Sequence, residues 1–227
     1  MRHSMIRLYL YVTITILCIH TSLAHPAQAA QATQAAPPPA FKEQLATPSL
    51  LKRLQAGGYV LYMRHGSTDN SRPDSVDGLD LKDCATQRVL DDAGRKTSAD
   101  VGQAMLAARI PVGAIFHSPM CRTRETAELA FPALRNLFVE ENGLMYTANL
   151  TTAQKAPILA TTRQLLSRPV LQGTNRVIVA HAPNLADIMG YFVKPEGTVV
   201  VIQPLGDDGF DYIASIPPNA WATLLKP

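Results

Sequence analysis

The sequence predicts an α/β protein, a three-layer sandwich in which a mainly parallel sheet carries helices on both faces. Short, continuous apolar runs at residues 59–63 and 176–180 are typical of strands that are buried on both faces. Segments with helical spacing alternate with these runs along the chain. Near the C-terminus, two extended segments flank the Gly-Asp-Asp-Gly turn at residues 206–209, which indicates a β-hairpin at the sheet edge.

Local signals define the elements of the first half. Pro48 fits the first position of a helix that Gly57-Gly58 ends, and Asp91 or Asp92 is the expected cap of a second helix. Between them, residues 67–86 are polar and rich in aspartate, which predicts a long loop of the kind that often has a function. The predicted elements here are a helix at 49–56, a strand at 59–63, the loop, a helix from Asp91 or Asp92 to about Arg109, and a strand at 114–117.

The second half continues the alternation and then ends in the hairpin. Residues 152–167 have the clearest helical spacing, and residues 137–140 form the weakest strand candidate. The predicted helices of this half lie at 119–131, 152–167, 184–192 and 218–225, and the predicted strands at 137–140, 176–180, 199–203 and 211–216.

The composition fits one globular domain and excludes several other classes. The chain has 227 residues, of which 47% are hydrophobic and 17% charged, so it is too apolar for a disordered chain. Three cysteines are too few for a disulfide scaffold. A formal net charge of +3 gives no reason to expect nucleic acid as a partner.

The first 29 residues have the pattern of a secretory signal peptide. Arg2 and Arg7 precede an apolar stretch at residues 8–23, and Ala27-Gln28-Ala29 matches the small-x-small pattern of signal peptidase. A cut after Ala24 is an alternative. An uncleaved anchor helix is less favoured, because the apolar stretch is shorter than the roughly twenty residues of a membrane span. We therefore expect a periplasmic or secreted protein with no stable membrane insertion after cleavage.

Cleavage after Ala29 would leave 198 residues (227 − 29) and lower the net charge to +1, because Arg2 and Arg7 are removed. Residues 30–47 are rich in Ala, Gln and Pro and predict a flexible linker. The expected organisation is a signal peptide at 1–29, the linker at 30–47, and one domain at 48–227.

Polar side chains follow three of the predicted strands at the point where each strand ends. Arg64-His65-Gly66 follows the first strand, His117-Ser118 follows the strand at 114–117, and His181 follows the run at 176–180. These are all the histidines that remain after signal cleavage. Because open α/β sheets bind ligands at the carboxyl ends of their strands, we expect the functional site at this edge.

The residue types at this edge favour an anion over a metal ion. Arg64 and Arg122 carry forked donors that match phosphate oxygens, and Arg122 lies in the first turn of a predicted helix, where free N–H groups also favour anions. A metal held by His65 and His181 is disfavoured, since Arg64 would repel a dication. An imidazole beside bound phosphate is placed to attack phosphorus, so the residues predict phosphate chemistry without a metal or cofactor.

Four motifs, in order along the chain, resemble those of the histidine phosphatase (phosphoglycerate mutase-like) superfamily. They are Tyr62-Met63-Arg64-His65-Gly66, the stretch from Leu90 to Arg95, Ser118-Pro119-Met120-Cys121-Arg122 with Thr126-Ala127, and Val179-Ala180-His181-Ala182. The resemblance implies that His65 is the nucleophile that forms a phosphohistidine. It also implies that Arg64, Arg122 and His181 bind the phosphate, and that no metal takes part.

Within this superfamily, the secreted branch of lipopolysaccharide heptose phosphate phosphatases is the most similar, through the signal peptide, residues 64–69 and the residues around Cys121. The resemblance implies a phosphoric monoester hydrolase of the histidine acid phosphatase type. Its substrate would be a phosphorylated small molecule or an envelope glycan. Two alternatives stay open: a mutase that transfers the phosphoryl group to a second substrate, and a catalytically weak protein that binds a phosphorylated ligand.

The general acid is where the sequence departs from the family pattern. Members often have a glutamate shortly after the third strand, and register through Gly143-Leu144 places Tyr146 there. Glu141 is the residue we select as the acid, and Glu140 and Asp69 are the other candidates.

Two cysteines lie close to the expected site. Cys84 is in the long loop and Cys121 is next to Arg122, so in an oxidising compartment they would be able to pair. The bridge would close a loop of 37 residues and stabilise the fold by about 4 kcal/mol in the chain-entropy model. It would also hold the long loop over the pocket. Two buried thiols are the alternative.

Overall fold

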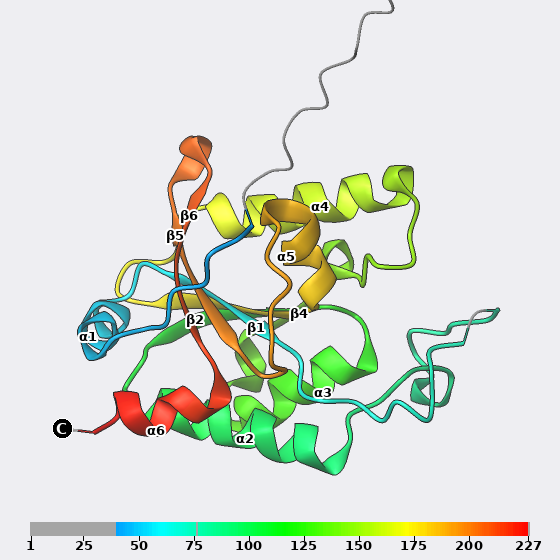
Figure 1. The fold of residues 1–227 in the computed structure, drawn as a ribbon, viewed down its shortest axis with the longest axis horizontal. Helices are drawn as coiled ribbons and strands as arrows, with labels where there is room; N and C mark the ends of the chain where they lie inside the picture. Colours follow the sequence, from blue (N-terminus) through cyan, green and yellow to red (C-terminus); the bar gives the residue numbers. More distant parts are fainter. Residues whose placement is uncertain (1–39, 76, 227) are drawn as a thin grey trace, which may run out of the picture. The chain divides into compact units, whose positions relative to one another are not determined.

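The computed structural model describes residues 40–75 and 77–226, which fold around one six-stranded sheet (Figure 1). The expected signal peptide and residues 30–39 of the expected linker lie outside the described residues. The order of strands across the sheet is β3-β2-β4-β1-β5-β6. The strands are β1 (Val60–Arg64), β2 (Val112–His117), β3 (Phe138–Glu140), β4 (Asn175–Ala180), β5 (Val199–Pro204) and β6 (Phe210–Ile216).

The sheet is mainly parallel and has an antiparallel hairpin at one edge. Three neighbouring pairs are parallel: β3 with β2, β2 with β4, and β4 with β1. β5 is antiparallel to β1, and β6 is antiparallel to β5. A short turn at Gly206–Asp208 connects β5 to β6. Both the predicted fold class and the predicted hairpin are therefore confirmed.

Helices cover both faces of this sheet (Figure 1). Leu61 and Met63 of β1 pack into one apolar core with α1, α2, α3 and α6, while Val60 and Tyr62 pack into a second core with α4 and α5. This alternation is the two-residue repeat of a strand that is buried on both sides. The helices are α1 (Pro48–Ala56), α2 (Asp92–Ala107), α3 (Cys121–Ala130), α4 (Thr152–Ser167), α5 (Ala182–Met189) and α6 (Trp221–Leu224).

Most element boundaries agree with the prediction, and the exceptions have local causes. α4 spans the predicted residues, and Asp91 caps α2 by accepting a hydrogen bond from the Gly94 backbone. α2 ends two residues early, because Arg109 has a left-handed backbone (φ 54°) that no helix continues through. α5 starts at Ala182 instead of residue 184, since Pro183 is accommodated in the first turn.

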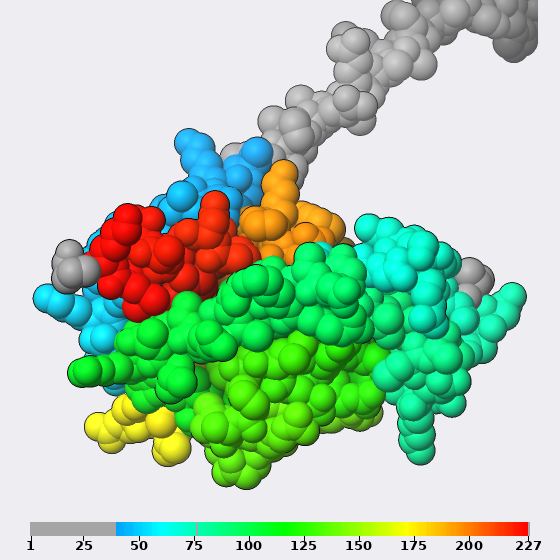
Figure 2. All heavy atoms as spheres, turned by 90° about the horizontal axis from the view of Figure 1, so that it is seen from below, coloured from blue at the N-terminus to red at the C-terminus, as the bar shows by residue number. Residues whose placement is uncertain are grey.

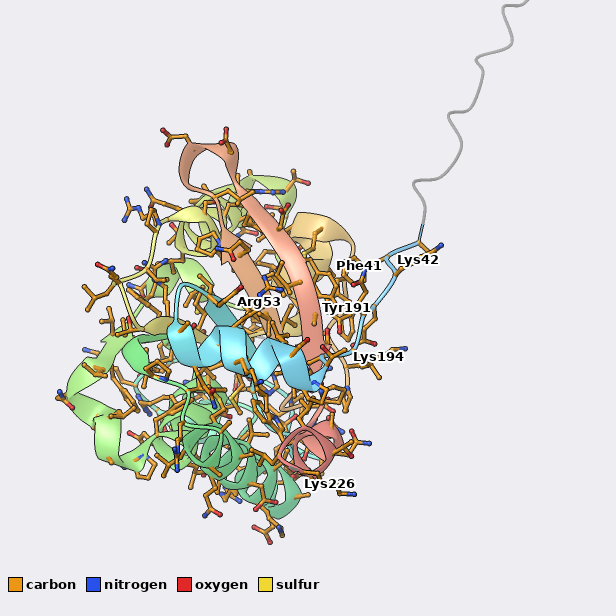
Figure 3. The ribbon with its side chains drawn as sticks, turned by 90° about the vertical axis from the view of Figure 1, so that its left-hand side faces the viewer. Phe41, Lys42, Arg53, Tyr191, Lys194 and Lys226 are labelled. Atoms are coloured by element: carbon orange, nitrogen blue, oxygen red, sulfur yellow. A yellow bond between two sulfur atoms is a disulfide. The ribbon has the colours of Figure 1, made fainter. Side chains whose placement is uncertain are left out.

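The segment from Phe41 to Ala46 departs from the prediction of a flexible linker over residues 30–47. Its backbone pairs with β6: the Ala46 N–H donates to the Ser215 carbonyl (3.0 Å), and the Ser215 N–H donates to the Gln44 carbonyl (2.7 Å). The Phe41 ring stacks on Tyr191 with 4.3 Å between centroids (Figure 3). This part of the expected linker therefore belongs to the domain, because an open strand edge and an aromatic partner hold it.

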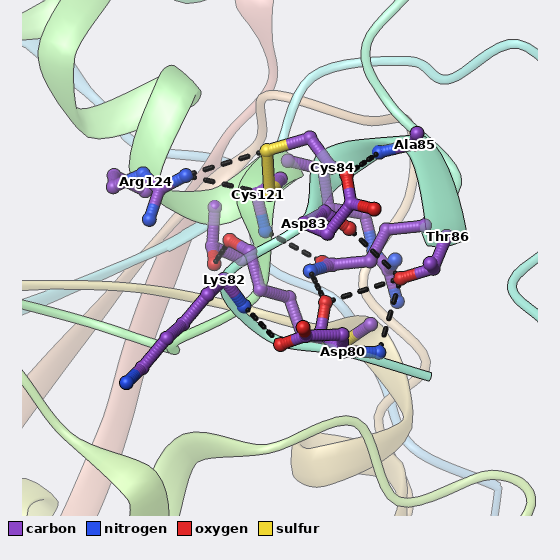
Figure 4. The surroundings of a disulfide bond; sticks show 12 residues. Asp80, Lys82, Asp83, Cys84, Ala85, Thr86, Cys121 and Arg124 are labelled. Atoms are coloured by element: carbon purple, nitrogen blue, oxygen red, sulfur yellow. Dashed lines mark hydrogen bonds between the residues drawn. A yellow bond between two sulfur atoms is a disulfide. The ribbon is translucent and has the colours of Figure 1, made fainter. Parts of the chain in front are cut away.

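The long loop is bound to α3 by a disulfide between Cys84 and Cys121, whose Cα atoms are 5.8 Å apart (Figure 4). The Gln87 side chain adds a second link by accepting a hydrogen bond from the Cys121 N–H (2.8 Å). Arg124, on the same helix, lies 3.3 Å and 3.4 Å from the two sulfur atoms. The predicted bridge is confirmed, and the loop that it holds projects from one end of the domain (Figure 2).

In the part of the chain that the structure describes, no helix has both the length and the apolar composition needed to cross a membrane.

Removal of the disulfide should destabilise the fold through the unfolded state. The bridge closes a loop of 37 residues, so replacing both cysteines (Cys84→Ser with Cys121→Ser) should lower the free energy of unfolding by about 2–4 kcal/mol. Urea denaturation of the oxidised protein and of the double variant measures the difference. A reductant should destabilise the wild type to the level of the variant and leave the variant unchanged. Equal unfolding free energies for the two oxidised proteins would contradict the assignment.

Candidate active site

The carboxyl ends of β1, β2 and β4 bring together residues that are far apart in sequence. The parallel register sets Arg64 beside Ala180, and the His65 N–H donates to the Ala180 carbonyl (3.1 Å). As a result, the rings of His65 and His181 lie 5.3 Å apart between centroids. Both side chains are buried. The sequence predicts a site at this edge, and the structure brings the two histidines together there.

The backbone at His65 fixes the orientation and tautomer of its ring. Nδ1 lies 2.7 Å from the Gly66 carbonyl oxygen, and since a carbonyl only accepts, Nδ1 carries the proton. The lone pair is therefore on Nε2. Gly66 is required here, because a Cβ atom would lie 2.5 Å from the Gly94 carbonyl oxygen. Burial, and next the charge of Arg122, lower the pKa of His65 to about 3, so the ring is neutral.

Arg122 brings a completely buried guanidinium to the site. Its side chain is 0% exposed, and Nη1 donates to the carboxylate of Asp74 (2.9 Å). Nε and Nη2 are buried and have no hydrogen-bond partner among the described residues. Burial lowers the pKa of Arg122, and Asp74 opposes this change. Buried donors of a charged group are costly to leave unpaired, so these two nitrogens indicate the position of an anionic ligand.

Arg64 is held in a similar way, by a carboxylate and a backbone carbonyl. Nη1 donates to the Val193 carbonyl (2.6 Å), and Nη2 forms an ion pair with Glu196. Nε is buried and has no partner within the described residues. Arg64 and Arg122 thus share one arrangement: a carboxylate fixes one end of the guanidinium, and at least one donor nitrogen is left for a ligand.

His181 is fixed through both its backbone and its ring. The Tyr62 hydroxyl donates to the His181 carbonyl (2.7 Å), and the His181 N–H donates to the same hydroxyl (3.2 Å). On the ring, Nε2 lies 3.0 Å from Ser118 Oγ, whereas Nδ1 is buried and unpaired within the described residues. Burial and then Arg122 hold the pKa of His181 well below its ordinary value, so this ring is also neutral.

His117 reaches the same edge and makes different contacts. Its Nδ1 lies 2.9 Å from the Ser118 carbonyl oxygen, and its ring packs edge-on against Phe138. These contacts support the end of β2, so His117 has a structural role.

The structure does not support Glu141 as the acid. Its carboxylate accepts a hydrogen bond from the Gly143 N–H (2.8 Å) and caps the short turn Asn142–Leu144. Glu140 ends β3 with an exposed side chain, and the exposed Asp69 carboxylate accepts from the backbone and hydroxyl of Ser71. No hydrogen bond or ion pair within the described residues joins these carboxylates to the histidines or arginines of the site.

Sequence reasoning missed two residues of the long loop that shape the site. Asp74 accepts from the Arg88 N–H (2.8 Å) as well as from Arg122, and so connects the loop to the buried guanidinium. The positive charge of Arg88 contributes to the lowered pKa of His65 and of His181. Its Nε is buried and unpaired among the described residues. The loop contains no motif that would have identified either residue.

Tyr146 lies against the same group of residues. Its ring centroid is 5.4 Å from that of His181, and the Arg122 guanidinium lies over the ring at 5.3 Å. Burial lowers the pKa values of Arg64 and Arg122, and the charge of an ionised Tyr146 opposes this on both guanidiniums. The phenol is therefore close to both arginines. The sequence placed Tyr146 at the family's acid position but gave it no role.

The arrangement suits a phosphate group. Guanidinium donors with open positions match phosphate oxygens, and a neutral imidazole with a free Nε2 is a nucleophile. Within residues 40–75 and 77–226, no three His, Cys, Asp or Glu side chains lie together in a way that would hold a metal ion.

Comparison with known proteins agrees with this chemistry. The family model described as histidine phosphatase superfamily (branch 1) matches residues 60–145, which include Arg64, His65 and Arg122. No curated protein sequence matches this chain.

Several solved structures share the fold. A putative alpha-ribazole-5'-P phosphatase from Escherichia coli is 12% identical, with a TM-score of 0.54 over 70% of this chain and 97% of that one. The alpha-ribazole phosphatase from Shigella flexneri is 12% identical, with a TM-score of 0.52 over 70% of this chain and 96% of that one. The protein histidine phosphatase SixA complexed with tungstate is 15% identical, with a TM-score of 0.50 over 71% of this chain and 97% of that one.

The family-model match and the structural similarity cover different extents of the chain. The family match covers the first two strands of the site and α3, while the shared fold covers most of the described residues. Together with the predicted motifs, the family match over residues 60–145 and the shared fold support assignment to the histidine phosphatase superfamily.

Proposed function

We propose that the protein is a phosphatase that hydrolyses phosphate monoesters through a phosphohistidine formed on His65. One observation carries the proposal: a neutral, buried imidazole with a free Nε2 lies beside the buried, unpaired donor nitrogens of Arg64 and Arg122. The family match supports the same reaction class. The neutral state of both histidines supports the finer assignment to the histidine acid phosphatase type, because His65 would stay nucleophilic at acidic pH.

The arginines and His181 bind the phosphate. Its oxygens accept from Nε and Nη2 of Arg122 and from Nε of Arg64, the nitrogens that the neighbouring carboxylates leave open. Ser118 Oγ accepts from the Met120 N–H (3.4 Å) and donates its own proton to His181 Nε2. The neutral His181 ring then carries its proton on Nδ1, which supplies a further donor to the phosphate.

His65 performs the transfer. Nε2 attacks phosphorus opposite the ester oxygen, and the P–O bond to the alcohol breaks as the P–N bond forms. The Gly66 carbonyl keeps the proton on Nδ1 while the ring gains positive charge. Water then attacks the phosphohistidine, breaks the P–N bond and releases inorganic phosphate. The surrounding guanidiniums stabilise the charge that develops on the phosphoryl oxygens in both steps.

Loss of the nucleophile should abolish turnover. His65→Ala should lower kcat/KM for p-nitrophenyl phosphate by at least about a thousandfold, because the covalent route is removed. His117→Asn is the matched control, since it changes a buried histidine of the same sheet edge whose ring contacts the Ser118 carbonyl and Phe138 instead of His65 or the arginines, and it should retain activity within about tenfold.

Other outcomes of these assays would overturn the proposal. Full activity in His65→Ala would exclude His65 as nucleophile. A wild type that binds phosphate without turnover would identify a phospho-ligand binding protein. Transfer of the phosphoryl group to a second substrate without release of phosphate would identify a mutase.

The pH dependence tests the neutral state of the histidines. Because burial and Arg122 lower the pKa of His65 to about 3, the ring is already deprotonated at pH 5. After correction for ionisation of the substrate, kcat/KM should change by less than about threefold between pH 5 and pH 7. A histidine with an ordinary pKa near 6.5 would lose about thirtyfold of its nucleophilic form at pH 5. A loss of that size would contradict the assignment.

The proposal extends to export and to the substrate. The signal-like N-terminus and the Cys84–Cys121 bridge support function in an oxidising compartment, the periplasm or the exterior. A phosphorylated small molecule or an envelope glycan, with lipopolysaccharide heptose phosphate as one candidate, is the substrate class that fits this location. The resemblance of residues 64–69 and of the residues around Cys121 supports the latter candidate.

Cell fractionation followed by mass measurement tests export. The full chain, produced with its own N-terminus in a bacterium, should appear outside the cytoplasm with a mass that lacks residues 1–29 or 1–24. A full-length chain in the cytoplasm would contradict this prediction. A panel of phosphorylated metabolites and envelope glycan phosphates then identifies the preferred substrate.

A further inference from the structure

The proposed reaction needs a proton donor for the leaving alcohol, because an alkoxide is a poor leaving group. The carboxylates that reach the site are already engaged: Asp74 binds Arg122 and Glu196 binds Arg64. Each carboxylate accepts a hydrogen bond from a guanidinium, so neither is free to act as the donor. Glu141, the donor that we expected from the sequence, is committed to the Gly143 backbone.

The Tyr146 hydroxyl is another candidate proton donor, because its ring lies against the residues of the site. Tyr146 follows the short turn after β3, and its ring packs edge-on against His181 (5.4 Å) and beneath the Arg122 guanidinium (5.3 Å). Its side chain is only partly buried. In an in-line reaction the leaving alcohol departs on the side of phosphorus opposite the attacking Nε2 of His65. Tyr146 is the phenol that borders the phosphate position indicated by the unpaired nitrogens of Arg122.

The position of the ring suits a proton donor. The Arg122 guanidinium lies over the Tyr146 ring at 5.3 Å, so a fixed positive charge is close to the phenolate that remains after the proton is given away. A phenol also has a lower ordinary pKa than an alcohol, so transfer of the proton to an alkoxide is favourable.

We propose that Tyr146 is the general acid of the phosphatase reaction and, in the second step, its general base. This proposal rests on the proposed function. In the first step the P–O bond breaks, the P–N bond to His65 forms, and the Tyr146 proton moves to the leaving oxygen, which gives the free alcohol and a phenolate. In the second step the phenolate takes a proton from the attacking water. The P–N bond then breaks, and Tyr146 and His65 return to their starting states.

The leaving group of the substrate separates a proton donor from a residue that only shapes the pocket. p-Nitrophenolate is a stable anion that departs without a proton, whereas the alkoxide of an alkyl phosphate must be protonated. Tyr146→Phe retains the ring and removes only the hydroxyl. It should therefore lower kcat/KM for glycerol 2-phosphate by about a hundredfold or more and change kcat/KM for p-nitrophenyl phosphate by less than about threefold.

Tyr59→Phe is the matched control, because it removes a tyrosine hydroxyl from the opposite end of β1, where the partner is Arg53. It should affect the two substrates equally, and thermal melting should show that both variants fold. Equal losses of kcat/KM on both substrates in Tyr146→Phe would reassign Tyr146 to positioning. No loss on either substrate, or a wild type that hydrolyses p-nitrophenyl phosphate but no alkyl phosphate, would overturn the proposal.

Failure of the proposed function gives a different result. In that case the wild type would hydrolyse neither substrate, or His65→Ala would retain activity, whatever the behaviour of Tyr146→Phe.

Discussion

The Arg122 guanidinium is a positive charge with no exposed surface, and much of the structure serves to keep it there. A charge removed from water is tolerated only when it is paired, and Asp74 satisfies one of its nitrogens. Asp74 lies on a loop with little core of its own, so its position depends on other bonds. The Cys84–Cys121 bridge and the Gln87 hydrogen bond hold that loop against the first turn of α3. The pairing is left incomplete at two nitrogens, which is what makes the site receptive to an anion.

Burial and, after it, the charge of Arg122 determine the state of the two histidines. A protonated imidazole beside buried arginines would add like charge in a low dielectric, so both rings stay neutral. Each ring then has one donor and one acceptor nitrogen, and backbone or hydroxyl contacts decide which is which. His65 and His181 therefore act differently although they leave neighbouring strands of one sheet. The difference lies in the Gly66 carbonyl for one ring and Ser118 for the other.

Much of the fold and part of the site could be predicted from the sequence. Buried strands can be recognised in the sequence as apolar runs, and the hairpin turn can be recognised from Gly206 and Gly209. Arg64, His65, Arg122 and His181 stand next to these elements, which is why their meeting at one edge could be foreseen. Asp74 and Arg88 could not, because the path of an irregular polar loop depends on tertiary contacts. Glu141 was wrongly favoured because residue type was weighed above direction: its carboxylate turns back to cap its own turn.

The segment from Phe41 to Ala46 has a consequence for the molecule as a whole. β6 is the outer strand of the hairpin, and an outer strand with unpaired backbone groups is a template for association with other chains. The hydrogen bonds from Ala46 and to Gln44 occupy part of that edge, and the Phe41 ring covers Tyr191 beside it. The Phe41–Ala46 segment thus covers part of an edge that would otherwise be open to edge-to-edge association. Any truncation that starts the chain at residue 47 would remove this protection while leaving every residue of the site in place.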